Sequence, residues 1–153
     1  MAGLEFRQEV PFSDVCFHGI VRDEKGIKMS KSLGNGIDPL DVIKEYGADA
    51  LRISLVLVTP EGQDPCISFN SFELGRNFAN KLWNASRLVM LSLHDFVPKP
   101  NLLQPDLKEN LTLADRWISS RLNKTILEVT KKLSEFQFNL AAKSLYDFVW
   151  HDF

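Results

Sequence analysis

The sequence predicts two consecutive regions of different structural class, mixed α/β over residues 1–64 and all-helical over residues 65–153. Three observations lead to this division. Residues 15–21 (VCFHGIV) are rich in β-forming side chains and precede a turn-forming Lys25-Gly26 pair. From about residue 68 onward, apolar residues recur with the period of a helix. Between these patterns, residues 60–65 hold two prolines and a glycine, which interrupt regular structure.

The mixed region is expected to begin with a hairpin and to continue into a polar loop. Residues 15–21 would form the first strand, and residues 27–29 the short return strand after the turn. Residues 30–36 follow as a loop, because they hold two glycines, two serines and an asparagine and offer little to bury.

Two short helices complete this region. Asp38 is a candidate N-cap, and Pro39 suits the first helical position. The first helix ends at Gly47, because glycine accepts the left-handed backbone that stops a helix. A second helix restarts at Asp49 and covers residues 50–58.

The all-helical region should contain three helices and one long connection. Ser71 is a candidate cap for a helix that ends near Leu93, and residues 94–110 hold three prolines and are expected to be a linker. Thr112 caps the next helix, and a break at 134–137 leads to the last one. The three helices have predicted apolar faces formed by Phe78, Leu82, Ala85 and Val89, by Ile118, Leu122, Ile126, Val129 and Leu133, and by Phe138, Ala141, Leu145 and Val149.

The composition is that of an ordinary globular chain, with 153 residues, 44% hydrophobic and 25% charged. It excludes a disordered tail, a collagen-like fibre and a coiled-coil rod. No apolar run approaches the roughly 20 residues that cross a bilayer, and no secretory signal is visible, so we expect no membrane association and a cytoplasmic location. The net charge of −2 excludes binding to nucleic acid by bulk charge. Two cysteines and three scattered histidines predict neither a disulfide framework nor a metal site.

Residues 28–32 (KMSKS) are the segment that suggests a chemistry. Lys28 and Lys31 put two ammonium groups on a loop after the hairpin, and Ser30 and Ser32 add two hydroxyl groups. An ammonium group is a compact charge that suits phosphate oxygens. On a loop that can close on a triphosphate, such charges stabilise the negative charge that develops in a transition state. The loop contains neither a Walker A sequence nor a GxGxxG sequence.

Taken alone, two lysines in a serine-rich turn are more simply explained as solvated side chains. The surrounding sequence instead favours a functional role for these lysines. KMSKS is the second signature of the class I aminoacyl-tRNA synthetases, and here it stands inside HGIVRDEKGIKMSKSLGNGIDPLDVIKEYGADALR, residues 18–52. This run resembles the catalytic domain of the subgroup specific for valine, isoleucine and leucine. Residues 75–90 (GRNFANKLWNASRLVM) are most similar to the helix after that domain in valyl-tRNA synthetases, and residues 114–123 (ADRWISSRLN) resemble the start of the next helix of their anticodon-binding bundle.

The resemblance covers nearly the whole chain and implies its fold. Residues 1–64 would be the C-terminal part of a Rossmann-like catalytic domain that carries the KMSKS loop. Residues 65–153 would be a helical segment and the start of an antiparallel, anticodon-binding helical bundle.

The resemblance also implies an activity and a set of site residues. The family member would be an ATP-dependent ligase that joins L-valine to ATP, with Mg²⁺ present, and then transfers the valine to its tRNA. The catalytic role falls on Lys31, which matches the second lysine of the signature and would stabilise the phosphates. Lys28, Ser30 and Ser32 complete the implied ATP-binding set, the first two as supporting contacts and Ser32 mainly by shaping the loop.

Two departures from the family pattern stand out. Gly36 occupies a position where the family usually has valine, which would loosen the loop. The HIGH signature, the first half of the nucleotide fold and the editing domain are not among the 153 residues. We therefore expect a piece of a longer enzyme that does not activate valine by itself, because half of an adenylation site cannot position the reactants.

Two alternatives remain open. The chain could be a stand-alone, non-catalytic RNA-binding or interaction module derived from a synthetase, with Arg121, Lys124, Lys131 and Lys132 on phosphates, although a solvated helix face explains these residues equally well. A structural helical domain with an accidental KMSKS match is disfavoured, because the likeness extends through YGADALR and KLWNASR. We expect His18 to be a structural residue on a strand, and the three tryptophans, Trp83, Trp117 and Trp150, to lie in helix–helix cores.

Overall fold

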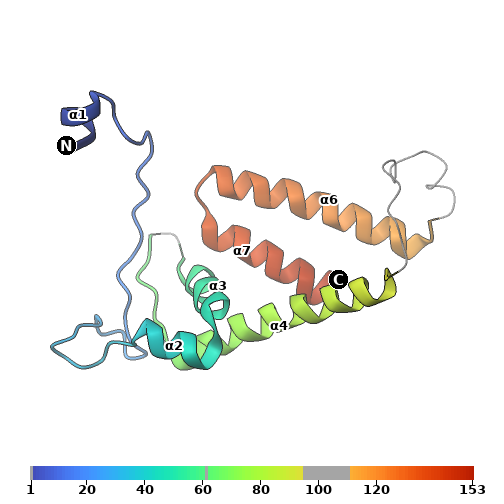
Figure 1. The fold of residues 1–153 in the computed structure, drawn as a ribbon, viewed down its shortest axis with the longest axis horizontal. Coiled ribbons are helices and arrows are strands. Elements are labelled where there is room, and N and C mark those ends of the chain that lie inside the picture. The colour runs from blue at the N-terminus through green and yellow to red at the C-terminus, as the bar shows by residue number, and fades with distance from the viewer. Residues whose placement is uncertain (1, 61, 95–110) are drawn as a thin grey trace.

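The structure is a computed structural model that describes residues 2–60, 62–94 and 111–153. The regular elements in these residues are helices: α1 (Ala2–Arg7), α2 (Pro39–Tyr46), α3 (Ala48–Val58), α4 (Phe69–Ser92), α6 (Leu113–Ser134), α7 (Phe138–Asp147) and the π-helical turn η1 (Phe148–Asp152). In Figure 1, α4 runs along one side of the molecule, α2 and α3 lie near its N-terminal half, and α6 and α7 form an antiparallel pair beside it. α1 buries no residue and lies at the end of an extended arm, away from the other helices (Figure 1).

The all-helical prediction for the second region is confirmed, but the predicted strands of the first region are wrong. No strand forms in the described ranges. Instead, Arg22 makes two isolated bridges, one antiparallel with Lys28 and one parallel with Cys66. The N–H of Ile20 donates to the side chain of Asp64 at 2.7 Å and not to a neighbouring strand. A segment with β-forming side chains becomes a strand only when it pairs with a second extended segment over several residues. Here the backbone pairs with other segments at isolated residues only.

The predicted starts of α2 and α3 agree with the structure within one or two residues. The Asp38 carboxylate accepts a hydrogen bond from the N–H of Leu40 at 2.8 Å, and Pro39 opens α2 as expected. Gly47 ends α2 with a φ of 91° and also precedes α3, which therefore begins at Ala48 and not at Asp49. This positive φ needs a glycine, so the sharp corner between the two helices depends on this residue.

The long helices also begin at capping residues. Thr112 caps α6 as predicted, and Asp115 completes a reciprocal capping box. At α4 the cap is Ser68 and not Ser71, whose hydroxyl instead accepts from the Ser68 N–H at 3.3 Å. The break before α7 is confirmed, with Phe136 at a φ of 60°. The linker predicted at 94–110 lies, from residue 95 on, outside the described residues.

The best-buried apolar cluster consists of Val42, Ile67 and Phe72, which come from α2, the segment before α4, and α4. Val21 and Met29 of the hairpin pack against this cluster, so the core supports the KMSKS segment directly. Around it pack further half-buried side chains: Ile37, Tyr46, Leu51, Leu55 and Val58. The hairpin therefore rests on α2, α3 and α4 and not on a sheet.

The helices α3 and α4 cross closely at Gly75. A Cβ atom at this position would lie 2.3 Å from the Ser54 hydroxyl oxygen and 2.4 Å from the Ala50 carbonyl oxygen. Ser54 and Ala50 are both buried. Only glycine allows this approach, because both neighbours would overlap with any side chain.

The predicted apolar faces of the last three helices are only partly covered. Thr125 is the buried residue of α6, with Ile118 and Val129 half-buried, whereas Leu122, Ile126 and Leu133 are exposed by about half. The face of α7 centres on Ala141 and Ala142, and Phe138 and Leu145 remain exposed. On α4, Phe78 is buried but Leu82 and Val89 are not. In each of these helices, neighbouring residues cover only one side of the predicted apolar face.

No described helix has the length and apolar character needed to cross a bilayer.

Candidate functional site

The KMSKS loop, defined here as residues 28–36, follows a tight turn. The N–H of Gly26 donates to the carbonyl of Asp23 at 2.9 Å, and the N–H of Asp23 donates to the carbonyl of Ile27 at 2.9 Å. Gly26 has a φ of 75°, as predicted for the turn. Met29 then donates its N–H to Val21 at 3.3 Å. The loop is therefore presented at the end of a short ribbon of paired backbone.

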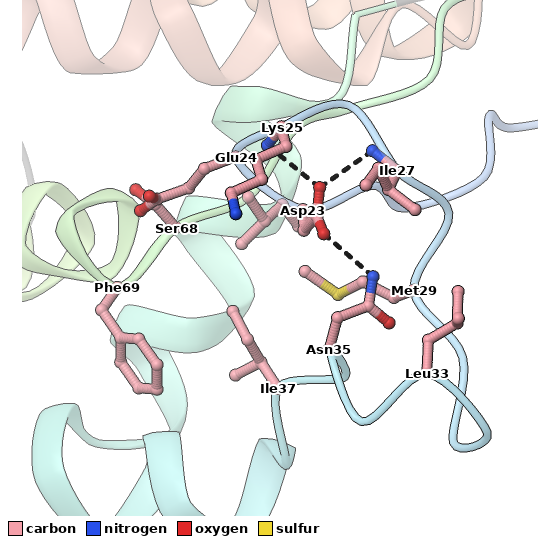
Figure 2. A pocket seen from close by; sticks show the side chains of 11 residues that line it. Asp23, Glu24, Lys25, Ile27, Met29, Leu33, Asn35, Ile37, Ser68 and Phe69 are labelled. Atoms are coloured by element: carbon pink, nitrogen blue, oxygen red, sulfur yellow. Dashed lines mark hydrogen bonds between the residues drawn. The ribbon is translucent and has the colours of Figure 1, made fainter.

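Asn35 ties the two ends of the KMSKS loop together. Its amide nitrogen donates to the Asp23 carboxylate at 2.9 Å and to the Lys28 carbonyl at 3.3 Å. Its amide oxygen accepts the N–H of Ser30 at 3.0 Å. Figure 2 shows Asn35 pointing at Asp23 across the cleft. One side chain thus satisfies backbone groups at the start of the loop and fixes them to the turn.

Asp23 is the fixed end of this arrangement. Its other carboxylate oxygen accepts the N–H groups of Lys25 and Ile27 at 3.0 and 2.8 Å (Figure 2). The hydrogen bonds from Asn35 and Ile27 lower the pKa of Asp23 below its ordinary value, since they stabilise the charged form. The carboxylate therefore stays charged and keeps all three donors at neutral pH.

Arg22 joins the base of the hairpin to the segment before α4. Its backbone pairs with Pro65 and Ile67 at 2.8 and 2.9 Å. Its guanidinium group forms an ion pair with Asp64 at 2.6 Å and donates to the Gly26 carbonyl at 3.1 Å. The pKa of Asp64 is lowered, first by the N–H of Ile20 and then by Arg22.

The structure places the four predicted site residues on one loop, where the two serines form hydrogen bonds within the loop and the two lysines extend into solvent. The Ser30 hydroxyl lies 3.2 Å from that of Ser32 and accepts the N–H of Leu33 at 3.3 Å, so both hydroxyls shape the turn. Lys28 and Lys31 are exposed, and within the described part of the chain neither ammonium group has an ion pair. Both ammonium groups can therefore reach an anion from solution.

Two clefts flank the loop. One, of about 400 Å³, is lined by Ser30 and Lys31 on one side and by Leu51 and Leu55 of α3 on the other. The second, of about 460 Å³, lies beside the turn, and Figure 2 shows its side chains. It is lined by Asp23, Glu24, Lys25, Ile27, Met29, Leu33, Asn35, Ile37, Ile67, Ser68 and Phe69. The loop therefore lies between two clefts, and α3 lines the cleft that also includes Ser30 and Lys31.

Sequence reasoning missed Asp23, Asn35, Arg22 and Asp64 as site residues. Two of them carry a readable signal, since an aspartate that opens a turn and an asparagine in a glycine-rich loop commonly bond nearby backbone N–H groups. The Arg22–Asp64 pair has no such signal, because its members stand 42 positions apart.

The other weighed residues give a mixed result. His18 is exposed and does not lie on a strand. Trp83, Trp117 and Trp150 are all exposed, so the core position predicted for them is wrong, although the ring of Trp150 stacks on that of Tyr146 with centroids 5.6 Å apart. Among the described residues, basic side chains of α6 form these ion pairs: Arg121 with Asp152, Lys131 with Glu135 and Lys132 with Glu128.

Comparison with known proteins identifies two family segments. Residues 1–68 match the model of tRNA synthetases class I (I, L, M and V), and residues 115–153 match the anticodon-binding domain of tRNA ligase. A solved structure also resembles the fold, with a TM-score of 0.70 and 27% identity over 86% of this chain and 17% of the other. It is the ternary complex of Agrobacterium radiobacter K84 agnB2 LeuRS–tRNA–LeuAMS. The chain is therefore homologous to part of the class I aminoacyl-tRNA synthetases, in residues 1–68 and 115–153.

The chain is also similar to curated valine–tRNA ligases. The chain is 48% identical to the valine–tRNA ligase of Thermotoga maritima over all 153 residues, and 52% identical to that of Carboxydothermus hydrogenoformans over 151 residues. It is thus homologous over its whole length to valine–tRNA ligase. It spans 17% of the length of each of these relatives. The sequence-based assignment is confirmed, while the domain division at residue 64 and the roles of the loop residues stay predictions.

Proposed function

We propose that this chain forms the part of a valine–tRNA ligase that closes on the phosphates of ATP during valine activation. The whole reaction joins L-valine to ATP, forming valyl-adenylate and pyrophosphate, and then transfers valine to the terminal ribose of the tRNA. The observation that carries the proposal is the exposed, unpaired state of Lys28 and Lys31, on a loop held by Asn35, within the described residues. The similarity to valine–tRNA ligases supports it.

In this proposal Lys31 supplies charge where the reaction needs it. The carboxylate oxygen of valine attacks the α-phosphorus of ATP, the bond to the β-phosphate oxygen breaks, and negative charge grows on the departing pyrophosphate. An ammonium group that meets this charge in the transition state lowers the barrier. Lys28 and Ser30 act as supporting contacts, and Ser32 maintains the loop shape. Mg²⁺ would neutralise phosphate charge, but the lysines and serines of this loop are not the carboxylate ligands that the ion prefers, so the loop itself would not hold it.

The remaining assignments follow from the same proposal. The partners of the whole protein would be ATP, L-valine and tRNA, with the helices after residue 112 on the tRNA side, supported by the anticodon-binding match. Protein synthesis would place it in the cytoplasm. The 153-residue chain alone would not activate valine, because the amino-acid pocket and the HIGH signature are not among its residues.

The test replaces Lys31 by alanine in a full-length valine–tRNA ligase that carries this segment. We expect valine-dependent ATP–pyrophosphate exchange to fall about 10²- to 10³-fold in kcat, as for other transition-state charge contacts. Lys25→Ala is the matched control, since Lys25 is an exposed lysine at the tip of the same hairpin. Equal rates for the two variants would remove the proposed role of Lys31.

A non-catalytic RNA-binding module is the second candidate, favoured by the anticodon-binding match over residues 115–153. Filter binding of the 153-residue chain to tRNA, with and without competitor RNA, tests it. Tight tRNA binding by a chain whose Lys31 is dispensable in the full-length ligase would favour this second function.

A further inference from the structure

The C-terminal end of α3 is capped by a residue from another helix. The last carbonyl groups of any α-helix lack partners within the helix. Here Pro60, just beyond the end, has no N–H to offer. The Thr59 hydroxyl donates to Leu55 at 2.5 Å. The amide nitrogen of Asn139 donates to the carbonyl of Val56 at 3.1 Å and also to that of Leu57.

Asn139 lies in the first turn of α7, 83 positions from Val56. It follows the turn between α6 and α7, and α3 and α7 are in contact (Figure 1). Asn139 is half-buried, and its hydrogen bond to the Leu57 carbonyl is partly shielded from water, whereas the bond to the Val56 carbonyl is exposed. This side chain therefore links the α6–α7 pair to the segment that precedes α4.

The other end of the link is the KMSKS loop. Leu51 and Leu55 of α3 line the same cleft as Ser30 and Lys31. The same two leucines pack on the buried cluster that also supports Met29. α3 thus lines one side of the cleft beside the loop, and its C-terminal end is held by Asn139.

We propose that Asn139 is a positioning residue that sets the orientation of the α6–α7 pair on the KMSKS-bearing segment, so that a tRNA held by these helices meets the activated valine in register. This inference rests on the proposed function. Asn139 itself touches neither substrate nor reacting atoms in this proposal. Its effect should therefore appear in the tRNA-dependent step and not in valine activation.

The test uses Asn139→Asp in a full-length valine–tRNA ligase that carries this segment. The carboxylate has nearly the shape of the amide but offers acceptors to the two carbonyl groups. We expect kcat/KM for tRNA aminoacylation to fall about 10-fold, while valine-dependent pyrophosphate exchange, corrected by active-site titration, changes less than about 2-fold. Asn84→Asp is the matched control, because Asn84 is an exposed asparagine on α4, outside the helices placed on the tRNA side. Asn139→Ala repeats the test without added charge, should the aspartate prevent folding.

The outcomes separate the possible roles. A selective loss of aminoacylation in the Asn139 variants, absent from the Asn84 control, supports the inference. A parallel loss of both activities per folded molecule, or no loss of either, overturns it. If Lys31→Ala leaves pyrophosphate exchange unchanged, the proposed function fails, whatever the Asn139 variants do.

Discussion

At the crossing of α3 and α4, the chain is held by close packing, and at the KMSKS loop it is held by hydrogen bonds. The crossing buries Ala50 and Ser54 against Gly75, with Phe72 buried next to it. The loop instead exposes Lys28 and Lys31 and depends on Asn35 for its closure. Packing resists any displacement, because a shifted side chain meets its neighbours at once. Hydrogen bonds at the surface can be exchanged for bonds to water at little cost.

This difference suits a mobile KMSKS loop beside a rigid crossing of α3 and α4. In the proposed function the loop closes on phosphates, and to do so it has to leave one set of hydrogen bonds and form another. Its support has to stay in place meanwhile, and the Val42–Ile67–Phe72 cluster provides that support from directly behind Met29. Four changes would break or sharpen the contrast.

The largest effect is expected for Phe72→Ala. Phe72 is 2% exposed, and its ring fills the centre of the cluster. Deletion of a buried phenyl ring costs about 3–5 kcal/mol of unfolding free energy. Urea unfolding of the 153-residue chain measures it. Phe6→Ala, at an exposed site in α1, is the control and should change almost nothing. Similar losses for both variants would refute the packed core.

Gly75→Ala comes next. The added Cβ atom would overlap both the Ser54 hydroxyl and the Ala50 carbonyl, and a backbone oxygen cannot rotate away. We expect a loss of about 1–3 kcal/mol in thermal or urea unfolding. Gly36→Ala is the matched control, because a Cβ there has nothing within 4 Å. A stable Gly75→Ala protein would show that the crossing is looser than described.

Asn35→Ala should act on the loop alone. It removes the partner of the Ser30 N–H and one of the three donors to the Asp23 carboxylate, so the two ends of the loop are no longer tied together. The expected result is faster trypsin cleavage after Lys28 and Lys31 with little change in global unfolding. Asn123→Ala serves as the comparison. Unchanged cleavage would mean that Asn35 does not hold the loop.

The smallest effect is a dependence on pH. The pKa of Asp23 in the fold is lowered, by Asn35 and then Ile27, from an ordinary value of 3.8. The unfolded chain therefore binds this proton at a higher pH than the folded chain does. The contribution of Asp23 is complete above pH 3.8 and disappears as the pH falls through its lower, folded value.

NMR can follow this transition at the amide groups of Ile27 and Ser30. Asp23→Asn should abolish the acid-side change at both. If the shifts of these amides move instead near neutral pH, another group controls the loop.

Much of the local structure was readable from the sequence. Asp38, Gly47 and Thr112 mark helix ends by local hydrogen bonding and backbone preference, and each does so in the structure. The KMSKS loop was located by its composition. These features depend on residues close together in the chain, so a short stretch contains all the necessary information.

The misses share one physical reason, which is dependence on distant partners. Residues 15–21 have β-forming side chains, but a strand exists only beside another strand. Leu122 and Ile126 follow a helical period, but that period does not show which flank of α6 a neighbour covers. Asn35 as the tie of the loop depends on Asp23, twelve positions earlier. Asn139 depends on the end of a helix 83 positions away.

The Arg22–Asp64 pair spans 42 positions, and it has a consequence for the order of folding. A growing chain leaves the ribosome from its N-terminus, so the turn after Arg22 can form while α2 and α3 are still being made. The base of that hairpin has to wait for Asp64 and Ile67, which close a long loop at an entropic cost. The end of α3 has to wait longer still, for Asn139. In nascent chains paused before residue 139, the hairpin should therefore already be closed. The C-terminal end of α3 should still be frayed and accessible to proteases and chaperones.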